Sequence, residues 1–448
     1  MKDTIAAIST PRGFGGIGII RMSGKEAKVI AEKVFSRNLE EPGRAYAGIV
    51  FDPNTREKID TCVGIYYKAP HSYTGEDVVE LQMHGGIKNL EVVLGTLLNL
   101  GSRLAERGEF TRRAFLNGKM DLLEASAVIE LIEAKTDRAL KIASKRLFGE
   151  ASGKIDSLKE KVLNLLSVIE GSIDFPFDVE NVEEEEILKR LEEIREEIQL
   201  MLSSYRIVRK IRDGVNVVIA GKPNVGKSTL LNTLLRFERA IVSETPGTTR
   251  DTVEEVIDFY GFPVKLIDTA GVRESPDKIE ALGMERTLKA IEESDLVLFV
   301  FDAAETLSSE DIYLAHLTEG RERIIVLNKM DLPYLVDREE LENLFKGEEI
   351  IETSALKKQG IEELERMMLE HISPVYIEDG FIADEREKGI LTQILGHIEA
   401  AISISGKGGD ELIAEELKEV ISKLGVISGE GATEDILDEI FLRFCIGK

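Results

Sequence analysis

The chain has 448 residues, enough for about three domains of ordinary size. Hydrophobic residues make up 43% of it, which excludes collagen-like, low-complexity and wholly disordered classes. The net charge of −26 is a poor balance for general binding of a nucleic-acid backbone. We therefore expect any nucleic-acid contact to be local, or to be made by another protein.

The cysteine content and hydropathy of the chain indicate the kind of cellular compartment in which it functions. Two cysteines, Cys62 and Cys445, are too few for a disulfide framework, which favours a reducing compartment. No apolar run approaches the roughly 18 residues of a membrane span, and the N-terminus lacks the pattern of a secretion signal. We expect no membrane partner.

The first 118 residues mix strand and helix patterns. Two short apolar runs flank a glycine-rich turn near the N-terminus, which predicts two strands joined by that turn. Leucines at helical spacing predict a helix over residues 90–100. The predicted strands are residues 4–9, 18–22, 63–67 and 78–81. We expect a compact α+β domain over residues 1–118.

The rest of the chain contains helical stretches on either side of an α/β pattern. Residues 119–210 and 375–448 show helical periodicity, whereas residues 211–374 alternate short apolar runs with helices. The continuous apolar character of those runs favours a parallel sheet covered on both faces. The predicted strands are residues 215–220, 264–267, 296–301, 324–327 and 349–351. The simplest arrangement is an α/β domain inserted into one helical domain.

Residues 221–228 read Gly-Lys-Pro-Asn-Val-Gly-Lys-Ser, a complete P-loop between a predicted strand and a predicted helix. Backbone N–H groups of such a loop cradle phosphates. Lys227 is expected to reach the β- and γ-phosphates, and Ser228 to ligate Mg²⁺. The loop alone predicts a nucleotide phosphate site.

Further motifs follow the P-loop in the order typical of a GTP site. Asp268 ends a predicted strand, where its carboxylate can hold Mg²⁺ through water. Asp331 of Asn-Lys-Met-Asp can accept both N–H donors of a guanine, a pair that adenine does not supply. The alternative is a doubly wound fold with a dead site. The predicted GTP contacts are Asn224, Val225, Gly226, Lys227, Ser228, Thr229, Ser243, Glu244, Thr245, Pro246, Gly247, Thr248, Thr249, Asp268, Thr269, Ala270, Gly271, Asn328, Lys329, Asp331, Ser354 and Ala355.

Two features differ from a small signalling GTPase. Val272 stands where a glutamine would orient the attacking water, so another group must do so. Glu280 is a candidate, with a solvated loop carboxylate as the alternative. Asn224 and the long segment 243–251 could surround a monovalent cation, which would stabilise charge much as an arginine finger does. For Asn224 the alternative is simple turn chemistry.

Motifs outside the GTP site narrow the class of GTPase. The P-loop, Thr-Pro-Gly-Thr-Thr-Arg-Asp and Asp-Thr-Ala-Gly resemble those of translation-factor-related GTPases. Further motifs are residues 3–7, 18–24, 72–77, 84–86 and 108–119, and the last four residues read Cys-Ile-Gly-Lys. With these motifs the chain resembles, over essentially its whole length, the MnmE (TrmE) family of GTPases that modify uridine 34 of tRNA. The Cys-Ile-Gly-Lys end is the most specific match to that family.

The resemblance implies an architecture and a set of partners. It implies an N-terminal α+β domain for tetrahydrofolate binding and dimerisation, a discontinuous helical domain and an inserted Ras-like P-loop GTPase domain. The implied protein is a cytoplasmic homodimer that acts with a FAD-containing MnmG (GidA)-like protein, which makes most of the tRNA contact. Together they would add an aminomethyl or carboxymethylaminomethyl group to C5 of the wobble uridine. The one-carbon unit would come from 5,10-methylene- or 5-formyl-tetrahydrofolate.

The resemblance also implies roles for single residues. Folate contacts fall on Arg21, Glu80, Lys119 and Lys448; without the resemblance, each would be taken as a surface charge. The implied Mg²⁺ ligands are Ser228 and Thr249, and the implied K⁺ ligands are Asn224, Ser243, Thr245 and Thr248. The implied catalytic residues are Glu280, Lys227 and Cys445, the last matching a cysteine needed for modification. For Cys445 the alternative is a buried, inert thiol.

Two other classes of protein compete with this interpretation. A ribosome-assembly GTPase would carry a basic RNA-binding module, and none is visible in the sequence. A signalling switch with no metabolic ligand is the other. Neither accounts for Arg21, Lys119 and the Cys-Ile-Gly-Lys end together.

Overall fold

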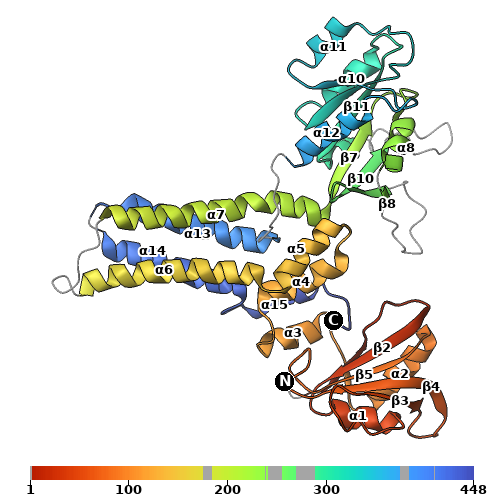
Figure 1. Cartoon of the computed structure of the whole chain (residues 1–448), viewed down its shortest axis with the longest axis vertical. Coiled ribbons are helices and arrows are strands. Elements are labelled where there is room, and N and C mark those ends of the chain that lie inside the picture. Colours follow the sequence, from red (N-terminus) through yellow and green to blue (C-terminus); the bar gives the residue numbers. More distant parts are fainter. Residues whose placement is uncertain are drawn as a thin grey trace. The chain divides into compact units, whose positions relative to one another are not determined.

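The computed structural model describes residues 3–174, 184–237, 239–240, 255–268, 288–373, 383–407 and 409–448. The chain divides into two compact units, which are described separately (Figure 1). The first comprises Met1–Ile132, Lys145–Arg190 and His397–Lys448, and the second comprises Glu133–Ser144 and Leu191–Gly396. Within the described ranges, no helix is both long and apolar enough to cross a membrane.

The N-terminal part of the first unit is a six-stranded sheet in the order β3-β4-β5-β2-β1-β6. Its strands are β1 (Ile5–Ile8), β2 (Gly15–Ser23), β3 (Ala45–Phe51), β4 (Lys58–Tyr67), β5 (Val78–Gly85) and β6 (Arg103–Leu104). Helices α1 (Ala27–Val34) and α2 (Ile87–Asn99) cover one face of the sheet, where Ile20, Leu81 and Val93 are buried together (Figure 1). The predicted α+β character is confirmed. The sequence did not predict β3, because this edge strand is mostly half-exposed and shows no clear apolar alternation.

The remaining helices of the first unit come from distant parts of the sequence. Their bounds are α3 (Glu109–Leu116), α4 (Leu122–Glu133), α6 (Glu150–Asp174), α14 (Asp410–Ser428) and α15 (Glu434–Phe441). Helices α6 and α14 run side by side (Figure 1). Leu122 of α4 shares a small core with Leu437, Phe441 and Phe444 near the C-terminus. Such packing fits a helical part that is discontinuous in sequence.

The second unit is built around a seven-stranded sheet in the order β13-β12-β11-β7-β10-β9-β8. Its strands are β7 (Val215–Ala220), β8 (Arg239–Ala240), β9 (Glu255–Phe259), β10 (Phe262–Asp268), β11 (Leu296–Asp302), β12 (Arg323–Asn328) and β13 (Ile350–Glu352). The five strands predicted from sequence pair in parallel, whereas β9 and β8 extend the sheet antiparallel. The sequence analysis did not predict β8 or β9.

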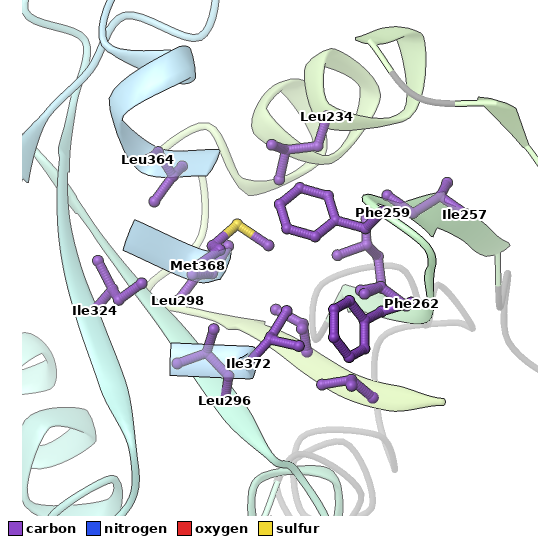
Figure 2. Close-up of a cluster of buried hydrophobic side chains, with 14 of the residues drawn as sticks. Leu234, Ile257, Phe259, Phe262, Leu296, Leu298, Ile324, Leu364, Met368 and Ile372 are labelled. Atoms are coloured by element: carbon purple, nitrogen blue, oxygen red, sulfur yellow. The ribbon is translucent and has the colours of Figure 1, made fainter. Parts of the chain in front are cut away.

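Both faces of this sheet are buried, as the continuous apolar runs predicted. Along β11, Leu298 and Val300 face one core while Phe299 and Phe301 face the other. Figure 2 shows Leu234, from α8, in the first core with side chains of β9 and α12. Four helices of the unit are α8 (Lys227–Phe237), α10 (Ser309–Leu317), α11 (Arg338–Leu344) and α12 (Ile361–Ile372).

Three further helices complete the description. They are α5 (Asp137–Leu147), α7 (Glu184–Asp213) and α13 (Glu385–Ile404). In the second unit, Thr136 Oγ1 donates a hydrogen bond to the carbonyl oxygen of Gly261, between β9 and β10, at 2.9 Å. Ala139 of α5 is buried in the same core as Phe262. The first turns of α5 therefore pack on the β9–β10 hairpin.

Candidate functional site

The P-loop joins the end of β7 to the start of α8 in the tight conformation that phosphate binding requires. Gly221, Asn224 and Gly226 have φ angles of 145°, 67° and 102°, all on the side that favours glycine. A Cβ atom built on Gly226 would lie 2.3 Å from Asn328 Nδ2. A side chain at Gly226 would therefore push the loop away from the guanine motif.

Lys227 is buried at the start of α8 and is oriented by the loop's own backbone. Its Nζ donates hydrogen bonds to the carbonyl oxygens of Gly221 and Lys222, each at 2.7 Å. Burial lowers the pKa of Lys227, while the charges of Asp268 and Glu310 oppose that shift. The ammonium is thus held over the loop, where phosphates would bind.

Ser228 and Asp268 meet at the carboxyl end of the sheet. The hydroxyl of Ser228 donates to Asp268 Oδ2 at 2.7 Å. Hydroxyl and carboxylate oxygens are the ligands that Mg²⁺ prefers, and Mg²⁺ usually keeps several waters besides. These two side chains fit the magnesium position predicted from sequence.

The guanine motif is tied to the P-loop by one amide. Asn328 Nδ2 donates to the carbonyl oxygen of Val225 at 2.9 Å, and Asn328 Oδ1 accepts from Ala355 N at 3.0 Å. Ser354 Oγ donates to Asp331 Oδ1 at 2.5 Å, which orients this exposed carboxylate. The described motif residues therefore converge at one edge of the sheet.

Sequence reasoning missed two groups beside this site. Lys329 Nζ is 2.5 Å from Asp302 Oδ2, which ends β11 and is buried. Lys222 of the P-loop pairs with Glu305 and with buried Asp311. The signal for Asp302 was an acidic residue directly after a fully apolar strand end; Asp311 had no local signal.

Part of the predicted site lies outside the described residues. This holds for Thr249 as a Mg²⁺ ligand, for three of the four K⁺ ligands and for the candidate catalytic Glu280. The residues concerned are Ser243, Glu244, Thr245, Pro246, Gly247, Thr248, Thr249, Thr269, Ala270, Gly271 and Glu280.

A second charged cluster lies in the first unit, on the sheet face opposite α1 and α2. Arg21 on β2 stands directly across from Glu80 on β5, with Nε and Nη2 at 2.9 and 2.8 Å from Oε1. The guanidinium carbon lies 5.6 Å from the ring centre of Tyr73 and 5.8 Å from that of Phe110. Two aromatic rings and a carboxylate therefore fix the Arg21 side chain.

The last residues of the chain join this cluster. The carbonyl oxygen of Gly447 accepts from Arg21 Nη1 at 3.4 Å, and that of Lys448 accepts from Phe110 N at 3.2 Å. Gly447 has a φ of 101°, and a Cβ atom there would lie 2.3 Å from the carbonyl oxygen of Ile8. Only glycine fits so close to β1, which explains one residue of the Cys-Ile-Gly-Lys end.

The electrostatics of the cluster suit an acidic ligand. Burial lowers the pKa of Lys448, and the positive charge of Arg21 lowers it further, while Glu80 opposes the shift. An arriving carboxylate would offset the repulsion between the two cations. Lys119, the fourth predicted contact, instead donates to the carbonyl oxygen of Pro70 at 3.2 Å. Cys445 is exposed, so the alternative of a buried thiol is wrong.

Two family models match successive parts of the chain. The family model described as GTP-binding protein TrmE N-terminus matches residues 4–119, and the one described as MnmE helical domain matches residues 122–445. A protein named tRNA modification GTPase MnmE from Thermoanaerobacter pseudethanolicus is 44% identical, over 100% of this chain and 99% of the relative. The protein of the same name from Aquifex aeolicus is 42% identical over 100% of both chains.

One solved structure similar to part of the chain is the G domain of the Thermotoga maritima FeoB iron transporter. It is 29% identical and covers 35% of this chain and 98% of its own, with a TM-score of 0.28. A TM-score this low carries no argument about the fold. The full-length relatives and the two family models identify the family of the chain.

Proposed function

The chain belongs to the MnmE family of GTP-hydrolysing tRNA modification enzymes, and we propose that it acts in the modification of the wobble uridine. The observation that best supports GTP as the substrate is the convergence of the P-loop and the guanine motif through Asn328. Asp331 is held by Ser354 with its carboxylate exposed, ready to accept the N–H donors of a guanine. The domains we propose are residues 1–118, 119–210 with 375–448, and 211–374.

Within the G domain each residue has a distinct role. The P-loop N–H groups and Lys227 bind the phosphates, and Ser228 and Thr249 hold Mg²⁺ with help from Asp268. Asn224, Ser243, Thr245 and Thr248 hold K⁺. When bound, the two cations offset the charge that develops on the transferred phosphoryl group. Glu280 orients the attacking water, since Val272 is unable to do so. The G domains of a homodimer come together for this step.

The Arg21 cluster is the proposed site for the one-carbon donor. Arg21 and Lys448 bind carboxylates of a tetrahydrofolate derivative, Glu80 accepts pterin N–H groups, and Lys119 contributes a further cation. The one-carbon unit then goes to C5 of the wobble uridine, together with a FAD-containing MnmG-like partner that provides most of the tRNA contact. Cys445 serves the same modification from its exposed position. The proposed location is the cytoplasm.

Calorimetric titration with 5-formyl-tetrahydrofolate tests the folate proposal. We expect saturable binding that is about thirtyfold weaker in Arg21→Ala. A flat titration of the unaltered protein would remove the basis for one-carbon chemistry and leave the GTPase proposal standing.

GTP turnover tests the G-domain roles. Hydrolysis should be faster in potassium than in sodium chloride, and Glu280→Ala should abolish turnover while sparing GTP binding. Equal rates in the two salts would refute the potassium site. Loss of nucleotide affinity in Glu280→Ala would remove its catalytic role.

A further inference from the structure

Lys222 is a P-loop residue with no assigned role at the phosphates. Its side chain turns away to a pair of carboxylates and is only 12% exposed. Lys222 Nζ lies 2.9 Å from Glu305 Oε2 and 3.1 Å from Asp311 Oδ2. Burial disfavours the charge on Lys222, but its hydrogen bonds to Glu305 and Asp311 outweigh that and raise its pKa.

Asp311 is the more buried of the two partners, with a side chain 2% exposed. It lies in the first turn of α10, where its Oδ2 accepts hydrogen bonds from Ser308 N at 2.9 Å and Ser308 Oγ at 2.7 Å. The same oxygen accepts from Lys222, while Oδ1 has no hydrogen-bond partner among the described residues. A buried carboxylate needs such compensation, so α10 and the P-loop are joined at one atom.

The backbone of Lys222 connects this pair to catalysis. Its carbonyl oxygen is one of the two that accept from Lys227 Nζ, at 2.7 Å. Asp311, in the first turn of α10, is therefore connected to Lys227 Nζ through the side chain and the backbone carbonyl of Lys222.

We propose that Asp311 is a positioning residue for GTP binding: through its ion pair with Lys222 it fixes the P-loop carbonyl that orients Lys227. The inference rests on the proposed GTPase function and extends it to residues outside the GTP contacts predicted from sequence. In this role the Lys222–Asp311 pair orders the P-loop before GTP binds. A loop that must first be ordered binds its ligand more weakly.

Steady-state kinetics of Asp311→Asn and Lys222→Met test the proposal. Each variant should raise KM for GTP and the Kd of a fluorescent GDP analogue about tenfold, with kcat at saturating GTP within about twofold. The double variant should be no worse than either single variant, because both break one pair. Lys222→Arg should restore most of the affinity, since the guanidinium keeps the charge.

The matched control is Asp337→Ala, which removes the side-chain cap of α11 and leaves Lys222, Ser308 and Asp311 in place. This variant should have a lower melting temperature and, where part of the protein is unfolded, a lower apparent kcat. Its KM should not change, because the molecules that remain folded bind GTP as the unaltered protein does. If Asp311→Asn changes KM no more than Asp337→Ala does, the positioning role is wrong. If the unaltered protein binds no guanine nucleotide, the proposed function itself fails, which is a separate outcome.

Discussion

The nucleotide site and the Arg21 cluster are built in opposite ways. The nucleotide site takes its residues from the P-loop and from the ends of parallel strands, and each group of residues is a short contiguous motif in the sequence. The Arg21 cluster joins residues of β2, β5 and the end of the chain, and its hydrogen bond from Arg21 to Gly447 spans 426 positions. Contiguous sequence motifs therefore predict the nucleotide site, whereas the Arg21 cluster forms only when distant segments pack together.

This difference also appears in what holds each site. Backbone geometry dominates at the P-loop, where Gly221 and Gly226 adopt positive φ angles. Side chains dominate at the cluster, where Glu80, Tyr73 and Phe110 surround Arg21. We therefore expect a single substitution at one site to leave ligand binding at the other site unchanged.

Lys227→Ala should reduce GTP hydrolysis about a thousandfold, because it removes the cation that meets the β- and γ-phosphates. Binding of 5-formyl-tetrahydrofolate should remain as in the unaltered protein. Turnover measured by phosphate release and titration calorimetry on the same preparation check both parts. A parallel loss of folate binding would contradict the independence of the two sites.

The two cysteines should differ in alkylation rate by about a hundredfold or more. Burial raises the pKa of Cys62 to about 12, helped by the charge of Asp60, whereas Cys445 is exposed beside the cluster. Mass spectrometry after timed treatment with iodoacetamide would follow each thiol. In Cys445→Ser only the slow reaction should remain. Similar rates at both thiols would contradict the burial of Cys62 or the exposure of Cys445.

Arg21→Ala should weaken binding of 5-formyl-tetrahydrofolate about thirtyfold, since a charge-assisted hydrogen bond is lost and Glu80 is left unpaired. GTP hydrolysis should not change. The matched control is Arg37→Ala, which removes an exposed arginine from the same α+β part. If both variants bind equally well, Arg21 does not hold the folate.

The pH dependence of folate binding should report Lys448. Because burial and Arg21 lower its pKa, its ammonium loses the proton at a lower pH than an ordinary lysine. Affinity for a ligand carboxylate should therefore fall as pH rises, by about threefold between about pH 8 and about pH 10. Lys448→Arg should flatten this profile, because arginine stays charged. A slope unchanged in Lys448→Arg would assign it to another group.

The sequence alone predicted the α+β, helical and α/β parts of the chain. It also predicted the P-loop and the guanine motif of the nucleotide site. The apolar runs of the parallel strands predicted burial on both faces, and β11 confirms this, because Leu298 and Phe299 are buried in the cores on opposite faces of the sheet. The P-loop was predictable because glycine placement and strand–loop–helix context are local properties. Ser228 and Asp268 could be paired in advance because parallel strands end at one edge of the sheet.

Tertiary structure alone decided the contacts between distant segments. The pairing of Arg21 with Glu80 depends on the pairing of β2 with β5, two strands that are neighbours in the sheet but are separated in sequence by β3 and β4. The place of Lys448 beside them depends on the fit of Gly447 against β1. The Lys222–Asp311 pair depends on how α10 packs against the sheet. The physical reason is common to all three: a local pattern constrains backbone conformation and burial, whereas the partner of a charged side chain is set by the packing of the whole fold.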